Sequence, residues 1–304
     1  MQRFDALSDN LKGATILVFA AALFTLGVAL IKLAGERIPV VQLLFLRQMG
    51  MLLMLSPALV RNFPENIRTN RPGLQLTRIF FALIALLGGF TAAINMPLAE
   101  ATSLGFAKSF FVTVFAVLIL KESVGPYRWV AIAVGFIGVG VMVQPGAEGF
   151  SLYGLYALAG AAAAGLVMVL IRLLSKTETT TSILGFQVFG VGIVTMVPAF
   201  LLWVPPTLQE WFVIIAIGVV SFFAQKANIY AYRHGEASLL ASLDYVRLLF
   251  ATVFGYFLFQ QLPQFSTWIG ASIIIVAAVF TVYRESKRKQ TLTRAPGARG
   301  FNNT

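Results

Sequence analysis

Residues 152–171 read LYGLYALAGAAAAGLVMVLI, a run of twenty residues without a charged side chain. At about 1.5 Å per residue, a helix of this length crosses the roughly 30 Å hydrocarbon layer of a lipid bilayer. Apolar and small residues lie on all of its sides, whereas a surface helix of a soluble protein keeps one polar face. The stretch therefore predicts a transmembrane helix.

Nine further apolar segments accompany this one along the chain. The ten predicted spans are 13–33, 40–60, 74–94, 100–120, 129–143, 152–171, 182–203, 211–232, 238–259 and 266–283. The hydrophobic fraction of 58%, the charged fraction of 12% and the mean hydropathy of +0.83 lie outside the composition of soluble domains. We therefore expect an all-α integral membrane protein with ten transmembrane helices.

Lysine and arginine collect in alternate connections between the predicted spans. The even-numbered connections and both termini contain basic residues, whereas the third, fifth, seventh and ninth connections contain none. By the positive-inside rule we expect a multi-pass protein of the cytoplasmic (inner) membrane with both termini in the cytoplasm. Only the first connection departs from this pattern, because it contains Arg37 and follows Lys32. The net charge of +11 is attributed to this topology rather than to a nucleic-acid partner, since no aromatic residues interleave the basic tail.

The two halves of the chain resemble each other at a nearly constant offset. One offset relates Lys108 to Arg247, Glu122 to Gln261 and Trp129 to Trp268, and it differs by a single position for Arg47 and Gln187. Because five spans per half is an odd number, the second half must enter the membrane from the opposite side. Inverted repeats are characteristic of secondary transporters, whose halves enclose a site near the middle of the membrane. A repeat kept only for packing is the alternative.

We therefore expect two inverted five-helix repeats around a central cavity, residues 13–143 and 151–283. A cytoplasmic head, residues 1–12, precedes them. A basic cytoplasmic tail, residues 284–304, follows them, and its low apolar content predicts disorder.

Several short motifs resemble the EamA-type transporters of the drug/metabolite transporter superfamily. They are PLAEATSLGF at 97–106, LILKE at 118–122, the glycine-rich fifth span with Gly135 and Gly138, and IRLLSKTE at 171–178. The resemblance covers about residues 13–283. It implies a central cavity lined mainly by spans 1, 3, 4, 6, 8 and 9, which opens alternately to the two sides of the membrane. Similar family members carry amino acids and other metabolites, S-adenosylmethionine or vitamins. The acidic residue usual after the ninth span is Gln261 here, so no role for it is carried over.

Five ionisable residues stand out inside the predicted spans: Arg47, Lys108, Lys226, Asp244 and Arg247. Each costs at least about 2.5–3.5 kcal/mol in lipid, so we expect it to face a cavity or a partner. Lys108 lies roughly 12 Å from the outer end of its span and Arg247 roughly 14 Å from the inner end of its own, so both come near mid-membrane. We expect these two cations to bind the anionic group of a substrate. The alternatives are a snorkelling or cross-helix role for Lys108 and a structural salt bridge between Asp244 and Arg247.

Further residues are assigned to the substrate site or to its scaffold. Asp244, Tyr245 and Tyr230 are expected to receive a cationic or ring portion of the substrate. Lys226 and Asn228 bring polar groups to one depth of the eighth span. Structural roles are expected for these residues: Arg47 as an interhelical tie, Glu122 as a local ion pair or cap, and Gly135 and Gly138 in helix packing.

The expected function is secondary transport of a small organic metabolite by alternating access. Two cations and one acid near mid-membrane suit a zwitterionic or carboxylate-bearing solute, such as an amino acid or its derivative S-adenosylmethionine. An exporter of drugs or aromatic metabolites, a passive channel and an intramembrane enzyme are the alternatives. No phosphate-binding glycine loop, metal cluster or nucleophile–base pair is found, so we expect no enzymatic activity, no metal and no cofactor. Proton coupling through Asp244 or Glu100, uncoupled movement, a monomer and a homodimer are all compatible with the sequence.

Overall fold

The computed structural model of the protein describes residues 9–61, 64, 68–105, 107–143, 152–235 and 246–260, together with short pieces further on. These pieces are residues 240, 243, 265, 268–270, 272, 273, 276, 277 and 280. No strand occurs among the residues described. The predicted head is described only from residue 9 onward, and the predicted tail lies outside the described residues.

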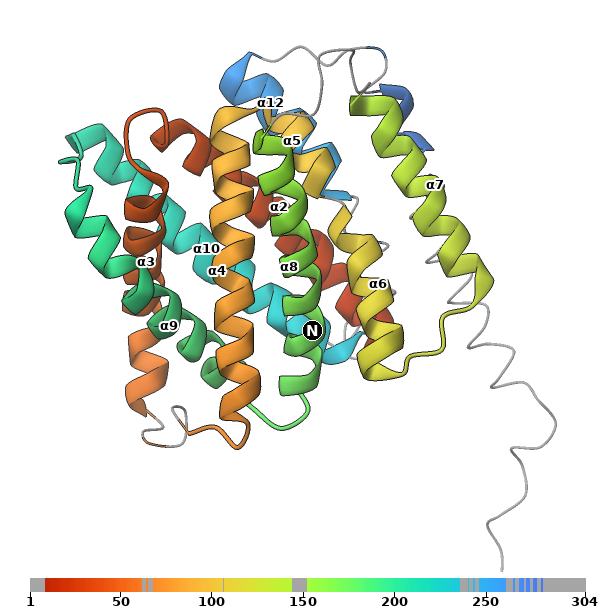
Figure 1. Ribbon diagram of the computed structural model, residues 1–304, viewed down its shortest axis with the longest axis horizontal. Coiled ribbons are helices and arrows are strands. Elements are labelled where there is room, and N and C mark those ends of the chain that lie inside the picture. Colours follow the sequence, from red (N-terminus) through yellow and green to blue (C-terminus); the bar gives the residue numbers. More distant parts are fainter. Residues whose placement is uncertain are drawn as a thin grey trace, which may run out of the picture.

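The helices follow one another along the chain with short connections. They are α2 (Asp9–Ala34), α3 (Val40–Arg61), α4 (Pro72–Asn95), α5 (Leu98–Gly105), α6 (Ala107–Leu120), α7 (Pro126–Val143), α8 (Leu152–Leu174), α9 (Thr180–Leu201), α10 (Leu208–His234) and α12 (Arg247–Phe259). Figure 1 shows them as one helical bundle.

Six helices in the described part of the chain are long and apolar enough to cross a bilayer: α2, α3, α4, α8, α9 and α10. They coincide with the first, second, third, sixth, seventh and eighth predicted spans. The fourth predicted span corresponds to α5 and α6 together, while α7 and α12 correspond to the fifth and ninth. The tenth is described only in pieces. The protein is therefore a multi-pass helical membrane protein, and the remaining four spans stay predictions.

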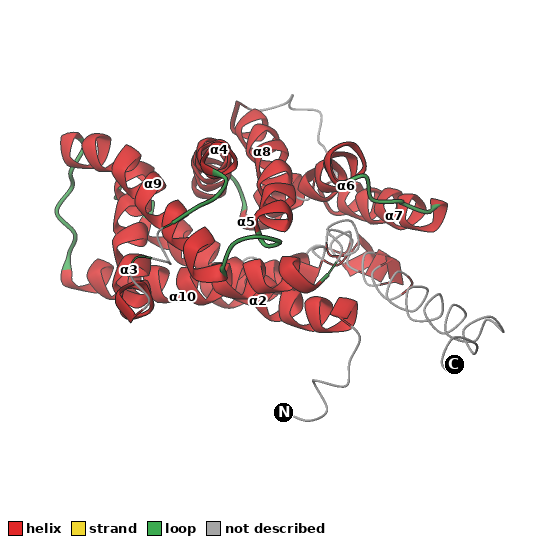
Figure 2. Ribbon diagram, turned by 90° about the horizontal axis from the view of Figure 1, so that it is seen from below, coloured by secondary structure: helices red, strands yellow, loops and turns green. Residues whose placement is uncertain are grey.

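The strongest helix packing joins the two halves of the chain rather than helices of one half. From the first half α2 packs along α10, and from the second half α8 packs along α4. Figure 2 shows α4 with α8 on one side of the bundle and α2 with α10 on the other. Because α2 and α8 begin the two halves while α4 and α10 are their third long helices, these are the same contact made twice. The contacts of α6 with α8 and of α12 with α2 repeat each other likewise.

A lysine joins the ends of two helices at one end of the bundle. Lys32, in the last turn of α2, donates hydrogen bonds from Nζ to the backbone oxygens of Ala93 at 3.0 Å and Met96 at 2.7 Å. These carbonyls lie at the C-terminal end of α4, where the helix has no internal donors left and its dipole is negative. Lys32 therefore caps α4 from the neighbouring helix.

An arginine makes the equivalent contact at another helix end. Arg172, in the last turn of α8, donates from Nη1 to the backbone oxygens of Tyr232 at 3.0 Å and Arg233 at 2.7 Å, near the end of α10. Arg172 and Lys32 are related by the offset of Arg47 and Gln187, and Tyr232 and Ala93 by the offset of Lys108 and Arg247, so each pair occupies equivalent positions in the two halves. The two caps are therefore one interaction repeated in both halves.

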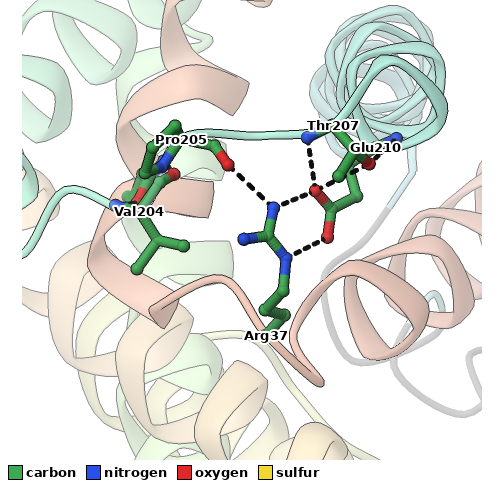
Figure 3. A network of polar contacts seen from close by, with 6 residues as sticks. Arg37, Val204, Pro205, Thr207 and Glu210 are labelled. Atoms are coloured by element: carbon green, nitrogen blue, oxygen red, sulfur yellow. Dashed lines mark hydrogen bonds and ion pairs between the residues drawn. The ribbon is translucent and has the colours of Figure 1, made fainter.

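The connection that breaks the alternation of charge is neutralised by its surroundings (Figure 3). Arg37, between α2 and α3, donates from Nε to Glu210 Oε1 at 2.7 Å, from Nη2 to Glu210 Oε2, and from Nη2 to the Pro205 oxygen at 2.8 Å. These hydrogen bonds to the Glu210 carboxylate raise the pKa of Arg37. Thr207 and Glu210 form a capping box at the start of α10, which holds the carboxylate in place.

These contacts give the relative direction of α2 and α8, the first long helices of the two halves. The end of α2 lies beside the start of α10, through Arg37 and Glu210. The end of α8 lies beside the end of α10, through Arg172 and Tyr232. The first helices of the two halves therefore run in opposite directions, as an inverted repeat requires.

A matching pair of backbone conformations also marks the repeat. Lys121 follows α6 with a φ of 54°, and Gln260 follows α12 with a φ of 55°. The same offset separates these two residues as separates Lys108 from Arg247, and non-glycine residues rarely adopt this left-handed conformation. In both halves a left-handed residue ends the helix, as is common at helix C-termini.

Candidate functional site

A cavity with two lobes lies among the helices of both halves. The α5 lobe, named after Ala101 and Thr102 of α5, holds about 800 Å³ of partly open space, and the α9 lobe, named after Gln187, holds about 820 Å³. Seven residues line both lobes: Phe24, Val28, Ala85, Phe90, Lys108, Ala164 and Arg247. The two cations predicted to bind substrate therefore lie where the lobes meet.

Close packing of α6 on α8 positions Lys108. Lys108 lies in the first turn of α6 and is only 6% exposed. On α8, Gly165 lets the two backbones approach, since an added Cβ would lie 2.7 Å from Phe111 Cβ and 3.3 Å from the Lys108 oxygen. Small residues permit such contacts between membrane helices. Gly165 thus allows the lysine to reach the cavity between the helices.

Arg247 approaches the same junction from the second half. It is the first residue of α12, and its guanidinium carbon lies 4.4 Å from the centre of the Phe24 ring of α2. This distance is in the range of a cation–π contact, which stabilises a charge where water is scarce. The structure thus brings the two repeat-related cations to one cavity, although they belong to different halves of the chain.

Arg47, expected to be structural, both ties helices together and lines the α9 lobe. It is 2% exposed, and its Nε donates to Ser221 Oγ of α10 at 2.7 Å. Its Nη1 donates to Gln48 Oε1 at 3.1 Å, and its guanidinium carbon lies 5.8 Å from the Phe90 ring centre. The interhelical tie is present, and a third cation also faces the cavity.

The other predicted binding residues lie elsewhere or outside the described residues. Asp244 and Tyr245 lie outside the described residues. Lys226 and Tyr230 have exposed side chains, and neither lines a lobe. Asn228 is buried and donates from Nδ2 to the sulfur of Met168 at 3.3 Å; Met168 lines the α9 lobe but Asn228 does not. These polar groups of the eighth span therefore do not converge on the cavity.

The remaining scaffold residues lie outside both lobes. The backbone N–H of Glu122 donates to the Ala116 oxygen at 3.2 Å, and the residue borders a small polar hollow with Arg172 and Lys176. Gly135 and Gly138 are buried along α7. A packing role remains the expectation for both glycines.

A buried series of hydrogen-bonded polar side chains lies beside the α9 lobe, and none of its members was among the five charged residues singled out in the sequence. Arg78, inside the third predicted span, is fully buried and donates from Nη1 to the Ile183 oxygen at 2.9 Å and from Nη2 to Gln187 Oε1. Gln225 Nε2 donates to the same Gln187 oxygen at 2.9 Å. Arg78 is a charged residue inside an apolar span, so the criterion used for the other five would have found it. Gln225 is neutral, and that criterion could not have found it.

The lining combines positive charge with aromatic and small side chains. The cations are Arg47, Lys108 and Arg247, and within the part of the chain that the structure describes no Asp or Glu lines either lobe. Guanidinium and ammonium groups in a dry site bind carboxylates or other anions through short, strong hydrogen bonds. Phe24 and Phe90 offer faces for an apolar or planar group. The cavity is suited to binding rather than to bond-breaking chemistry.

Comparison with known proteins identifies the family. The model of the EamA-like transporter family matches residues 11–144 and again residues 151–283. The S-adenosylmethionine uptake transporter of Rickettsia prowazekii is 28% identical over 286 residues, which cover 93% of this chain and 96% of the relative. The riboflavin transporter of Brucella anthropi is 28% identical over 85% of this chain and 94% of the relative. The pseudopaline exporter of Pseudomonas aeruginosa is 30% identical over 89% and 96%.

A solved crystal structure has the same fold. It superposes with a TM-score of 0.76 at 20% sequence identity, and the match covers 91% of this chain and 98% of the other. The family model that matches twice accounts for the repeat, and the resemblance to EamA-type drug/metabolite transporters is confirmed. The chain belongs to the EamA-like transporter family and is a multi-pass membrane transporter of small molecules, not an enzyme.

Proposed function

We propose that this protein is a secondary transporter that moves a small carboxylate-bearing metabolite across the cytoplasmic membrane by alternating access. In this proposal ten spans form two inverted repeats, and both termini lie in the cytoplasm. The observation that carries the proposal is the position of Lys108 and Arg247. These repeat-related cations lie together where the two lobes of the cavity meet.

Electrostatics favour an anionic group at this junction. Three cations line the cavity, and each is expensive in a low-dielectric environment unless an opposite charge or strong acceptor approaches it. A carboxylate accepts hydrogen bonds from both an ammonium and a guanidinium group. A bound carboxylate would therefore recover part of the cost of keeping Lys108 and Arg247 within the membrane.

The aromatic lining and the relatives narrow the solute class. Phe24 and Phe90 line both lobes and can pack on a planar ring. Among the similar proteins, several are S-adenosylmethionine uptake transporters, and S-adenosylmethionine combines a carboxylate with an aromatic base. An amino acid or amino-acid derivative is thus the proposed class, with S-adenosylmethionine as its first candidate. Asp244 and Tyr245 stay candidates for its cationic part.

Export is the second candidate, and it differs from the first only in direction. The observation in its favour is the 30% identity to a pseudopaline exporter. An inverted repeat works in either direction, because the two open states are nearly equivalent. The ion gradient, if one is coupled, decides the direction of net movement.

The test is counterflow in proteoliposomes preloaded with unlabelled S-adenosylmethionine, with the radiolabelled compound outside. We expect saturable counterflow that Lys108→Ala abolishes, while Lys226→Ala, which removes a cation outside both lobes, leaves it intact. An imposed pH gradient drives accumulation only if protons are coupled. Absence of counterflow for S-adenosylmethionine and for a panel of amino acids would refute the solute class. Unchanged counterflow in Lys108→Ala would remove this residue from the site.

A further inference from the structure

Gln225 carries an acceptor that the protein itself does not use. The side chain of Gln225 lines the α9 lobe and is 7% exposed. Its Oε1 is buried and has no hydrogen-bond partner. Nearly all buried polar atoms in proteins are hydrogen-bonded, so an unpaired one at a binding cavity calls for a partner.

The orientation of this amide follows from its neighbours. Arg78 can only donate, so Gln187 must present its Oε1, not its amide nitrogen, to the guanidinium. The same Gln187 oxygen then requires a donor from Gln225, which turns Nε2 toward it at 2.9 Å. Flipping the Gln225 amide would set two oxygens against each other. The arginine thus fixes both amides and leaves Gln225 Oε1 as the free acceptor.

The position of this acceptor relative to the cations defines a second recognition point. Ser221 and Gln225 are four residues apart on α10, so they share one face of the helix, and both line the α9 lobe. Lys108 and Arg247 line both lobes, whereas Ser221 and Gln225 line the α9 lobe but not the α5 lobe. A solute anchored by its carboxylate at the junction would extend its far end into the α9 lobe.

We infer that Gln225 Oε1 accepts a hydrogen bond from a neutral N–H group at the far end of the solute. This inference rests on the proposed function and narrows its solute class to molecules with a carboxylate at one end and an amide, amino-heterocycle or similar N–H donor at the other. The site then selects against isosteres that lack the donor, because they leave the acceptor unpaired.

The experiment pairs two solutes with two proteins. The solutes are S-adenosylmethionine and its analogue in which hydrogen replaces the amino group of the adenine ring, so the donor is lost without added bulk. The proteins are the wild type and Gln225→Leu, which removes the acceptor at similar volume while Gln187 keeps its bond from Arg78. Inhibition of S-adenosylmethionine counterflow by each compound gives their relative affinities.

We expect the wild type to prefer the amino compound by about tenfold or more, and Gln225→Leu to lose this preference. A melting temperature of Gln225→Leu close to that of the wild type shows that the leucine variant is folded. Asn228→Leu, a buried polar change on the same helix outside the lobe, should keep the preference for the amino compound.

The outcomes separate this inference from the proposed function. If the wild type transports S-adenosylmethionine but binds both compounds equally, or if Gln225→Leu still discriminates, the role of Gln225 is refuted and transport stands. If the wild type binds neither compound, the solute class and the role of Gln225 both fall. The inference is supported if Gln225→Leu no longer discriminates between the two compounds while the wild type and the control variant still prefer the amino compound.

Discussion

Replacing Lys32 or Arg172 should bias the cavity toward opposite ends of the molecule. Lys32 joins α2 to α4, and these helices supply Thr25, Gly89 and Ala93 to the wall of the α5 lobe. Arg172 joins α8 to α10, which supply Met168, Ser221 and Gln225 to the wall of the α9 lobe. Each cation thus ties together two helices between which the cavity would have to open. In alternating access one tie must break while the other holds.

The size of the effect follows from the hydrogen bonds that are lost. Lys32→Met keeps the length of the side chain but removes two charged hydrogen bonds to carbonyl oxygens. Such bonds contribute about 1.5–3 kcal/mol each when buried, and roughly 1 kcal/mol each is reasonable for a half-buried lysine. A loss of about 2 kcal/mol shifts the ratio of open to closed at that end by about 30-fold. Arg172→Met removes two equivalent bonds and should shift the other end similarly.

The assay uses the absence of cysteine from the chain. A single Thr102→Cys places the only thiol in the α5 lobe, beside the helices that Lys32 joins. The rate of labelling by a membrane-impermeant maleimide added outside cells measures opening at that end. In the proposed orientation Lys32→Met raises this rate and Arg172→Met lowers it. Lys226→Met, which alters a cation outside both lobes, serves as the control.

The directions in which Lys32→Met and Arg172→Met change the labelling rate test whether the two cations hold opposite ends of the cavity closed. Rates that move in the same direction in both variants would show that the two ties do not act on opposite ends. Rates that stay at the wild-type value would show that neither cation holds the cavity closed.

Two further predictions concern the stability of the bundle. Gly50→Ala should lower the melting temperature of the purified protein, because its Cβ would lie 2.9 Å from the Gly218 Cα, a backbone atom that cannot turn aside; Gly73→Ala, with nothing within 4 Å, should not lower it. An equal melting temperature for the two variants would contradict the close approach. Glu178→Ala should cost about 1–3 kcal/mol of unfolding free energy, since the buried Gln75 amide loses its carboxylate acceptor. A denaturant titration in detergent measures this cost. A variant as stable as the wild type would show that the hydrogen bond from Gln75 to Glu178 does not stabilise the protein.

Hydrophobic length was a sufficient guide to the long helices because lipid leaves the backbone few alternatives. A segment in hydrocarbon must satisfy its own N–H and C=O groups, so an apolar run of the right length is a helix. The six long helices accordingly match six predicted spans. The repeat offset was equally informative for Lys108 and Arg247, since symmetry places equivalent residues around one axis. Hydrophobic length can be read from each segment alone, and the repeat offset can be read by comparing the two halves of the chain.

The cavity-facing residues of α10 show where this reasoning fails. Charge inside a span singled out Lys226, whereas the lobe is lined by Ser221, Ala224 and Gln225. Neighbouring residues on a helix point about 100° apart, so Gln225 can face a cavity while Lys226 faces outward. The cost of burying a charge predicts that the charged group has polar partners, but it does not predict on which face of the helix those partners lie. Helix orientation is set by packing against distant segments, which one span does not encode.

The exception in the charge pattern has the same origin. Lys32 and Arg37 contradict the alternation when basic residues are counted connection by connection. The structure places Lys32 on the carbonyls at the end of α4 and Arg37 on Glu210, in the second half of the chain. Both cations therefore have polar partners in the folded protein, which stabilise them where they lie. Without these two residues the alternation would have no exception, and the alternation stays the basis of the proposed cytoplasmic position of both termini.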